Sequence, residues 1–309
     1  MIRLHRSDHA DALVRALAEV LSEPPADPFA REIVAVPTRG MERWLTQQLS
    51  AHLGTSDGAG DGVCAAVEFP LPGRLLGDAL AGAADIDPET DPWRSERLTW
   101  PLLQLAEELA DESWMAPLAR HLRAEDGQHY ARIAHLASLY HRYEQERPEL
   151  IETWLSGSDS RWQAELWRHL RERLGVPSPA ERLGPACARL ADEPELVDIG
   201  ERPAFFGLTR LSIAHAQLLS ALAQTREVHL MLLHPSPALW DTVAALTPAR
   251  GPRRSDPSAK AANNRLLASW GRDVRELQIL LGAADSRAPE RAETSAHSRT
   301  PECPETPAP

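Results

Sequence analysis

The stretch that decides the fold is Glu32-Ile-Val-Ala-Val-Pro37, followed by the turn Thr38-Arg39-Gly40. A short apolar run rich in β-branched residues and stopped by proline is typical of a strand buried in a parallel sheet. Thr38 is one of the residue types that cap helices, so we expect a helix to follow and to cover residues 41–53. The stretch predicts one strand–loop–helix unit of an α/β domain.

The same kind of unit occurs on both sides of this stretch. Alternating strands and helices with short connections indicate a parallel sheet. The expected strands cover 2–5, 63–67, 204–207 and 227–233, and the expected helices cover 9–22, 73–83 and 212–224.

Most residues between the expected strands at 63–67 and 204–207 have the apolar spacing of helices instead. An apolar stripe at Leu98, Leu102, Leu105 and Leu109 is followed by others up to about Leu190. We predict a helix-rich α/β protein, with a parallel-sheet domain and a large all-helical insertion. The expected ranges are 1–90 for the first part of the α/β domain, 91–200 for the helical insertion, 201–282 for the return to the α/β domain and 283–309 for a disordered tail. Within the third range we expect a loop over 247–264 and one helix over 265–281.

The first strand–turn–helix unit is laid out like that of a nucleotide-dependent motor, but its turn lacks the residues that hold phosphate. A P-loop needs glycines in the turn and a Gly-Lys-Ser/Thr where the helix begins. The turn here is Arg6-Ser-Asp-His9, no glycine precedes Gly40, and the single lysine of the chain is Lys260. The expected fold is helicase-like, similar to P-loop NTPases but degenerate, and without an ATP site.

Composition narrows the classes of function. The 309 residues carry a formal net charge of -12, which disfavours a protein that coats nucleic acid nonspecifically but leaves room for a local basic channel. The three cysteines are far apart and predict reduced thiols. The sequence has neither an apolar run long enough to cross a bilayer nor a signal peptide, so we expect a cytoplasmic protein without membrane contact.

The sequence contains no recognisable catalytic motif. It has no Gly-x-Ser-x-Gly and no His-Glu-x-x-His, and Ser258 stands where an Asp…Glu-x-Lys nuclease would need an acid two residues before Lys260. We predict no catalytic site, no metal and no cofactor in this chain. Two histidine pairs lack further ligands at metal spacing, and we expect ordinary surface or strand-end side chains for them: His5/His9 and His229/His234.

Arginine and tryptophan are the residues that could contact nucleic acid. For most arginines we expect solvated helix faces with acidic partners, as for Arg168 near Glu165. Several tryptophans fall on apolar stripes and could either stack on bases or pack in a core, and core packing is the prediction for them. They are Trp44, Trp100, Trp154, Trp162, Trp167 and Trp270.

Four segments, in order, carry a family resemblance. The first combines Arg3-Leu-His-Arg-Ser7 with Val36-Pro-Thr-Arg-Gly-Met-Glu-Arg-Trp-Leu45, and the second is Phe69-Pro-Leu-Pro72. The third runs from Leu136 to Trp154, with Trp162-Gln-Ala-Glu-Leu-Trp167 after it. The fourth, Asn263-Asn-Arg-Leu-Leu-Ala-Ser-Trp-Gly271, is the most specific, because such a string is hard to obtain from composition. Over residues 1 to about 282 the chain resembles the RecC family, the gamma chains of exodeoxyribonuclease V.

The resemblance implies a non-catalytic DNA-binding scaffold subunit of the RecBCD helicase–nuclease, which acts in double-strand break repair by homologous recombination. RecC-like chains have a helicase-like fold that has lost its ATP site, hold the partner helicases together, and guide and scan single-stranded DNA. The implied partners are the beta and alpha helicase/nuclease subunits and single-stranded DNA. ATP and Mg²⁺ are expected only in those partner subunits.

The resemblance also implies positions for a single-strand channel. The loop after the second strand, the Phe-Pro-Leu-Pro segment and a helix of the insertion would line it. Guanidinium groups next to the matching positions could contact phosphates or stack on bases, and their types differ from those of better-known relatives, so a different sequence readout is expected. The candidate DNA-binding residues are Gly40, Leu71, Leu139 and Arg147, with the neighbours Arg39, Arg43 and Arg142.

RecC-like chains are considerably longer, with a second helicase-like domain and a C-terminal domain. We therefore expect a truncated product or a fragment that holds part of the channel. Two rival interpretations stay open. One is an autonomous nucleotide-binding hydrolase with an unrecognised site. The other is a protein-interaction module over helices 98–182, or a decayed fragment, without DNA contact.

Overall fold

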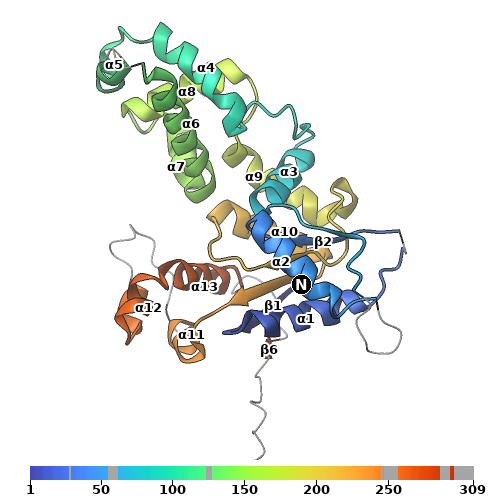
Figure 1. The fold of residues 1–309 in the computed structure, drawn as a ribbon. Helices are drawn as coiled ribbons and strands as arrows, with labels where there is room; N and C mark the ends of the chain where they lie inside the picture. Colours follow the sequence, from blue (N-terminus) through green and yellow to red (C-terminus); the bar gives the residue numbers. More distant parts are fainter. Residues whose placement is uncertain are drawn as a thin grey trace, which may run out of the picture. The chain divides into compact units, whose positions relative to one another are not determined.

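The computed structural model describes residues 1–27, 29–54, 62–122, 127–244, 246, 257–285 and 293–295. The chain divides into two compact units. The first contains Met1–Pro72, Ile199–Arg210 and Arg226–Pro309, and the second contains Gly73–Asp198 and Leu211–Thr225. Each unit is therefore assembled from segments that lie far apart in the sequence (Figure 1).

A parallel sheet forms the centre of the first unit. Its strand order is β3-β2-β4-β5-β1-β6, and each neighbouring pair is parallel, which confirms the predicted sheet. The register places Ile2 opposite Val228 and Val34 opposite Ala204. The strands are β1 (Ile2–Ser7), β2 (Glu32–Ala35), β3 (Val67–Glu68), β4 (Ala204–Phe206), β5 (Val228–Leu233) and β6 (Glu293–Ser295).

Helices cover this sheet because their apolar stripes need a surface to bury against. α1 (Ala10–Ser22) packs on β1, β5 and α2 (Arg39–Ser50). α1 and α2 are the blue helices of Figure 1. Leu13 and Leu17 of α1 and Leu45 of α2 are at most 1% exposed, and they share a core with Val34 and Phe206 of the sheet. Three further helices follow β5: α11 (Pro237–Ala244), α12 (Arg265–Ser269) and α13 (Arg272–Asp285).

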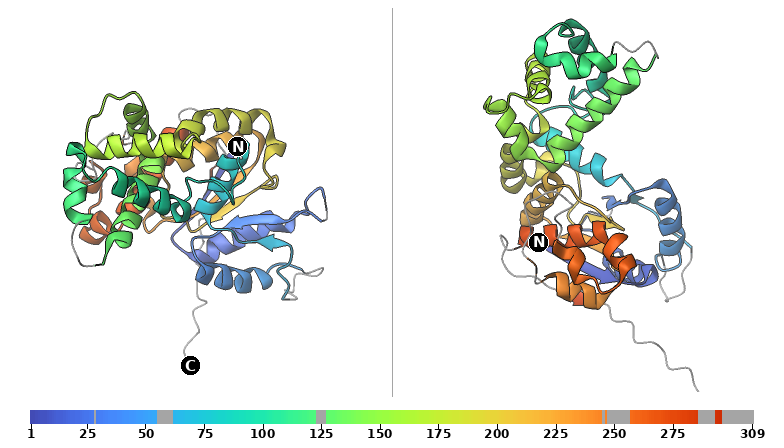
Figure 2. Two further views of the ribbon diagram at one scale, coloured as in Figure 1. Left: turned by 90° about the horizontal axis from the view of Figure 1, so that it is seen from above. Right: turned by 90° about the vertical axis from the view of Figure 1, so that its left-hand side faces the viewer.

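The second unit is helical throughout the part of the chain that the structure describes. Its core contains the stripe Leu98, Leu102 and Leu105 that the sequence predicts, together with the buried aromatic residues Trp154 and Trp167. Its α-helices among the described residues are α3 (Pro72–Ala83), α4 (Ser95–Glu108), α5 (Ala116–Leu122), α6 (His129–Glu146), α7 (Pro148–Leu155), α8 (Trp162–Leu174), α9 (Pro179–Asp192) and α10 (Ile213–Thr225). Figure 2 shows α4 to α8 of this unit in green shades, packed against one another.

A carboxyl group lies inside this helical core. Glu144 of α6 is 2% exposed, and its carboxylate accepts hydrogen bonds from Trp167 Nε1 at 2.9 Å and from the backbone N–H of Ala180 at 2.9 Å. Burial disfavours the charged form and raises the pKa of Glu144 to about 7, although these hydrogen bonds act in the opposite direction.

Several element predictions need correction. The strand expected over 63–67 is restricted to Val67–Glu68, because Ala66 has a left-handed φ of 55° that interrupts an extended strand. The single helix expected over 265–281 is two helices, α12 and α13, separated by Trp270 and Gly271. The helix α11 was not expected. Of the predicted loop over 247–264, only 257–264 are among the described residues, and they begin with a 3₁₀ turn, η4 (Pro257–Ala261). Of the predicted tail over 283–309, residues 283–285 end α13 and 293–295 form β6, and the rest lies outside the described residues.

Two of the tryptophan predictions are also wrong. Trp154 and Trp167 are buried as expected, and Trp44 and Trp162 are partly buried against the two cores. Trp100 is 59% exposed and Trp270 is 86% exposed, so neither packs in a core. An apolar stripe on a helix does not by itself tell which side of that helix is covered.

Candidate nucleic-acid interface

The start of α2 lies at the carboxyl edge of the sheet. β2 ends at Ala35, and Thr38 caps the helix, with its Oγ1 accepting from the backbone N–H of Met41 at 3.1 Å. Arg39 and Gly40 therefore occupy the first turn of α2, and Arg43 follows one turn later. All three are exposed. Uncapped N–H groups at a helix start and nearby guanidinium groups both favour an anion such as a phosphate.

The Phe-Pro-Leu-Pro segment lies beside this helix start. It follows β3, which pairs with β2 in parallel, so both loops leave the same edge of the sheet. The backbone N–H of Val36 donates to the carbonyl of Pro70 at 3.0 Å, which fixes the two loops to each other. Leu71 comes next and is 49% exposed. The structure thus brings together the four candidate residues that belong to the first unit.

The arginines of this edge have no acidic partners among the described residues. No carboxylate of a described residue lies within 4.0 Å of the guanidinium group of Arg39 or Arg43, whereas many other arginines form ion pairs with Asp or Glu. Arg31 pairs with Glu68 and Arg202 with Glu32, for example. Guanidinium groups without an internal partner can bind an external phosphate without first breaking an ion pair.

The other three candidates belong to the second unit. Leu139 and Arg142 lie on α6, where a spacing of three places them on one side of the helix. Arg147 stands at the junction of α6 and α7. Arg142 and Arg147 are exposed, and neither has an acidic partner within 4.0 Å among the described residues. Leu139 is half-buried against the helical core.

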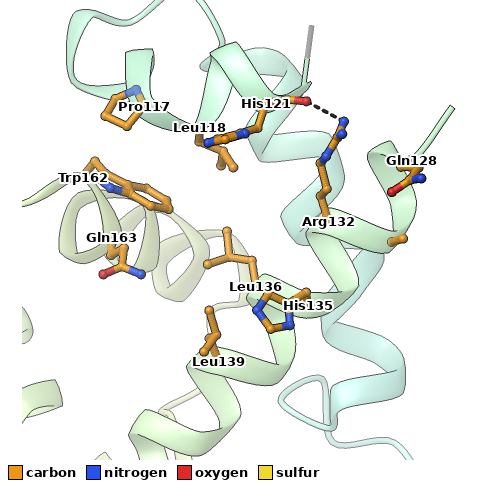
Figure 3. A pocket seen from close by; sticks show the side chains of 11 residues that line it. Pro117, Leu118, His121, Gln128, Arg132, His135, Leu136, Leu139, Trp162 and Gln163 are labelled. Carbon is orange, nitrogen blue, oxygen red and sulfur yellow. Dashed lines mark hydrogen bonds between the residues drawn. The ribbon is translucent and has the colours of Figure 1, made fainter. Parts of the chain in front are cut away.

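A groove of about 600 Å³ opens beside Leu139 (Figure 3). Leu118, Leu136 and Trp162 give it an apolar floor, and polar side chains line its rim. One of them, Arg132, donates to the backbone carbonyl of His121 at 2.6 Å. Such a groove could hold a planar apolar ring with polar edges, which is the chemistry of a nucleobase.

Most of the residues that line the groove were not predicted from the sequence. Gln128, Arg132 and His135 line it together with Leu139, and they belong to α6 or its N-terminal boundary. Their spacing of three or four residues, counted back from Leu139, was the signal that could have identified them. Trp162 comes from α8, and no pattern in the sequence brings it to α6.

The first strand–helix turn does not have the form of a phosphate loop. β1 ends at Ser7 and α1 begins at Ala10, so only Asp8 and His9 lie between them. Ser7 Oγ accepts from the backbone N–H of His9 at 3.1 Å, and Asp8 Oδ1 lies 2.7 Å from His9 Nδ1. A short turn without glycine that carries a carboxylate offers no cradle of N–H groups for phosphate.

The histidines show no arrangement for a metal within the described residues. Nε2 of His5 and Nδ1 of His229 are 3.1 Å apart, and their rings stack. Burial lowers the pKa of both, that of His229 to about 4, and the charge of Arg3 acts in the same direction. In the part of the chain that the structure describes, no three His, Cys, Asp or Glu side chains are placed to hold a metal ion. The same part contains no helix with the length and apolar character of a membrane span.

The fold and these surfaces define a helix-rich parallel α/β protein whose first strand–helix turn lacks a phosphate loop. Its exposed candidate arginines lie at the start of α2 and on α6 and the junction of α6 with α7. A family model, the RecC N-terminal domain, matches residues 2–304. The chain is 41% identical over 301 residues to the RecBCD enzyme subunit RecC of Mycobacterium tuberculosis, a match that covers 92% of this chain and 27% of that protein. The chain therefore belongs to the RecC family.

Further members give the same result. The RecBCD enzyme subunit RecC of Mycolicibacterium smegmatis is 40% identical over 297 residues, which is 92% of this chain and 26% of the relative. That of Escherichia coli K12 is 25% identical over 331 residues, which is 93% of this chain and 28% of the relative. The chain spans about a quarter of the length of these curated relatives.

Proposed function

We propose that this chain is a non-catalytic, DNA-guiding part of a RecC-type subunit in an exodeoxyribonuclease V helicase–nuclease that repairs double-strand breaks. The observation that carries the proposal is a pair of exposed arginines at the start of α2, Arg39 and Arg43, which have no acidic partner among the described residues and stand beside Leu71. Membership of the RecC family supports the same role. In this proposal the arginines contact the phosphates of a single strand, and the groove beside Leu139 accommodates bases.

The short turn between β1 and α1 supports a subunit that does not hydrolyse ATP. Two residues without glycine, one of them Asp8, replace the loop that would bind nucleotide phosphates in a helicase motor. A degenerate helicase-like ancestry for the α/β unit is part of this proposal. ATP, Mg²⁺ and the nuclease reaction would then belong to partner chains.

The proposed partners are the beta and alpha chains, RecB and RecD, and single-stranded DNA. The relatives are named as subunits of the RecBCD enzyme, which supports assembly with two such chains. A cytoplasmic location is part of the proposal. A surface of the second unit supports the rival function of a protein-interaction module. Trp100 and Tyr130 are 59% and 50% exposed, and their rings form a pair with centroids 5.3 Å apart.

Fluorescence anisotropy with a labelled oligo(dT) of about 20 nucleotides tests the DNA-guiding proposal. The wild-type protein should bind at low salt, and the double variant Arg39→Glu/Arg147→Glu should bind at least about tenfold more weakly, because each unit then presents a carboxylate to the phosphates in place of a guanidinium. Arg15→Glu is the matched control, since Arg15 is an exposed arginine of α1 outside the candidate surfaces. A wild-type protein that binds no oligonucleotide at about 50 mM salt would contradict the proposal and favour the interaction module.

A further inference from the structure

The short helix α12 and the residue after it hold two large apolar side chains in solvent. Leu266 is 67% exposed and Trp270 is 86% exposed, and their spacing of four residues places them on one side of the helix. The indole of Trp270 has no ring contact or hydrogen bond with another described residue. α12 packs against η4 and α13. An indole left this open is unusual for a structural tryptophan.

A buried arginine, Arg275, holds α12 through hydrogen bonds to its backbone. Arg275 is 0% exposed, and its guanidinium donates to the carbonyls of Ala268, at 2.8 Å, and of Leu267, and to Ser258 Oγ at 3.1 Å. A cation at the C-terminal carbonyls of a helix stabilises that end. Burying a whole guanidinium group is costly unless it is fully hydrogen-bonded, so this arrangement holds α12 in place.

Backbone geometry restricts the same helix at both ends. Asn264 caps it, with Oδ1 accepting from the backbone N–H of Leu266 at 2.8 Å. A Cβ on Gly271 would lie 2.6 Å from the carbonyl oxygen of Leu267. Only glycine therefore allows the backbone at residue 271 to pass this close to the last turn of α12. The backbone that carries Trp270 is therefore held in place, which lowers the entropic cost of ordering this segment when a partner binds.

The surroundings of Trp270 are cationic. Lys260, Arg265 and Arg272 are exposed, and none has an acidic partner within 4.0 Å among the described residues. Residues 257–276 contain these three cations and Arg275 against the two acids Asp273 and Glu276, which gives 4 − 2 = +2. The whole chain carries -12. A local positive charge in an acidic protein indicates an anionic partner.

We propose that α12 and its flanks form a second single-strand contact, in which the Trp270 indole stacks on a base and Lys260, Arg265 and Arg272 contact the neighbouring phosphates. Stacking on exposed aromatic side chains within a basic surface is the general chemistry of single-strand binding. A protein partner is less favoured, because two apolar side chains are a small part of the roughly 800 Å² that each side of a specific protein interface buries. This inference rests on the proposed DNA-guiding role and adds a site that the role alone does not require.

Photo-cross-linking to an oligonucleotide that contains 5-bromodeoxyuridine locates the contact directly. Trypsin cleaves after Arg265 and Arg272, so a cross-link at Trp270 should appear on the peptide of residues 266–272. Anisotropy should show Trp270→Ala binding about five- to a hundredfold more weakly than the wild type, and Trp270→Phe should keep most of the affinity. Trp100→Ala is the matched control, because Trp100 is also an exposed tryptophan but has no place in this surface.

The outcomes separate the two proposals. Cross-linking of 266–272 together with weaker binding by Trp270→Ala supports the second contact. If the wild type binds the oligonucleotide and Trp270→Ala binds it equally well, this inference is wrong and the DNA-guiding role is unaffected. No binding by the wild type at about 50 mM salt overturns both. If Trp270→Ala binds oligonucleotide normally but no longer co-purifies with the RecB and RecD chains, the surface binds protein and the inference is wrong.

Discussion

Asp91 and Arg182 form a buried ion pair in the second unit. An Arg182 terminal nitrogen donates to Asp91 Oδ2 at 2.7 Å, and the Asp91 and Arg182 side chains are 9% and 4% exposed. Asp91 Oδ1 also accepts from the backbone N–H of Trp93 at 3.0 Å. The pair fixes the segment before α4 to α9, across a sequence separation of 91 residues. Removing either partner would leave the other charge buried and uncompensated.

Asp91→Ala should destabilise the protein by about 3–5 kcal/mol in urea denaturation, the usual cost of breaking a buried ion pair from one side. The double variant Asp91→Leu/Arg182→Met should recover much of that stability, because it removes both charges and fills the space with apolar atoms. Glu108→Ala is the control, since Glu108 and Arg173 form an exposed pair whose removal should barely change the urea midpoint. A double variant no more stable than Asp91→Ala would show that the pair contributes more than charge compensation.

Glu144 should make stability fall as pH rises. Its folded pKa is raised from 4.5 to about 7, so between these values the unfolded chain has ionised while the folded protein still holds the proton. The contribution is fully favourable below pH 4.5 and disappears as pH rises through about 7. At about 1.4 kcal/mol per pKa unit, the decrease in the free energy of unfolding is roughly 3 kcal/mol.

The test compares urea unfolding of wild type and Glu144→Gln at about pH 5 and about pH 8, on either side of the folded pKa. The wild type should lose stability relative to the variant over this interval. The partly buried His215 and the buried His229, whose pKa values are lowered to about 4, change stability with the opposite sign, but they are present in both proteins and cancel in the difference. Glu152→Gln, an exposed carboxylate of α7, is the control. Parallel pH profiles for wild type and Glu144→Gln would refute a neutral Glu144.

Gly271→Ala and Gly282→Ala should change stability in opposite directions. A Cβ at Gly271 would meet the Leu267 carbonyl oxygen at 2.6 Å, so the chain between α12 and α13 must shift at a cost of roughly 1–3 kcal/mol. A Cβ at Gly282 in α13 has no described neighbour within 4 Å, and alanine there should stabilise the helix by about 0.5–1 kcal/mol. Thermal denaturation measures both. Equal effects of the two substitutions would mean that the junction is not held as tightly as its geometry indicates.

The salt dependence of DNA binding should distinguish the roles of the residues beside α2. Arg39→Ala/Arg43→Ala should reduce the slope of log K against log salt by about 0.7 for each phosphate that is no longer neutralised on a single strand. Leu71→Ala should weaken binding without changing that slope, since a leucine neutralises no phosphate. Anisotropy titrations between about 50 and 200 mM salt give both quantities. An unchanged slope in the double arginine variant would show that these arginines do not bind the phosphates.

The sequence predicted the sheet because periodicity and proline mark its strands. The runs at 32–37 and 227–233 are continuous and apolar, and they became β2 and β5 in the interior of the sheet. The exposure of Trp270 could not be predicted, since the sequence of α12 does not show which side of the helix faces Arg275 and which faces solvent. The groove beside Leu139 depends on how α5, α6 and α8 pack, which local spacing cannot give. The arginines were chosen through resemblance, and whether a described carboxylate pairs with them is visible only in three dimensions.

The pairing of Ile2 with Val228 has a consequence for the nascent chain. At about 5–20 residues per second, roughly ten to forty seconds pass on the ribosome between synthesis of β1 and synthesis of β5. β2 likewise waits for β4, because Val34 pairs with Ala204. The helical segment 73–198 emerges completely within that delay, and its local contacts allow it to fold first. β2 can meanwhile pair with β3 on one side, but β1 and the other side of β2 lack their strand partners, so we expect the first unit to be the part that depends on ribosome-associated chaperones during translation.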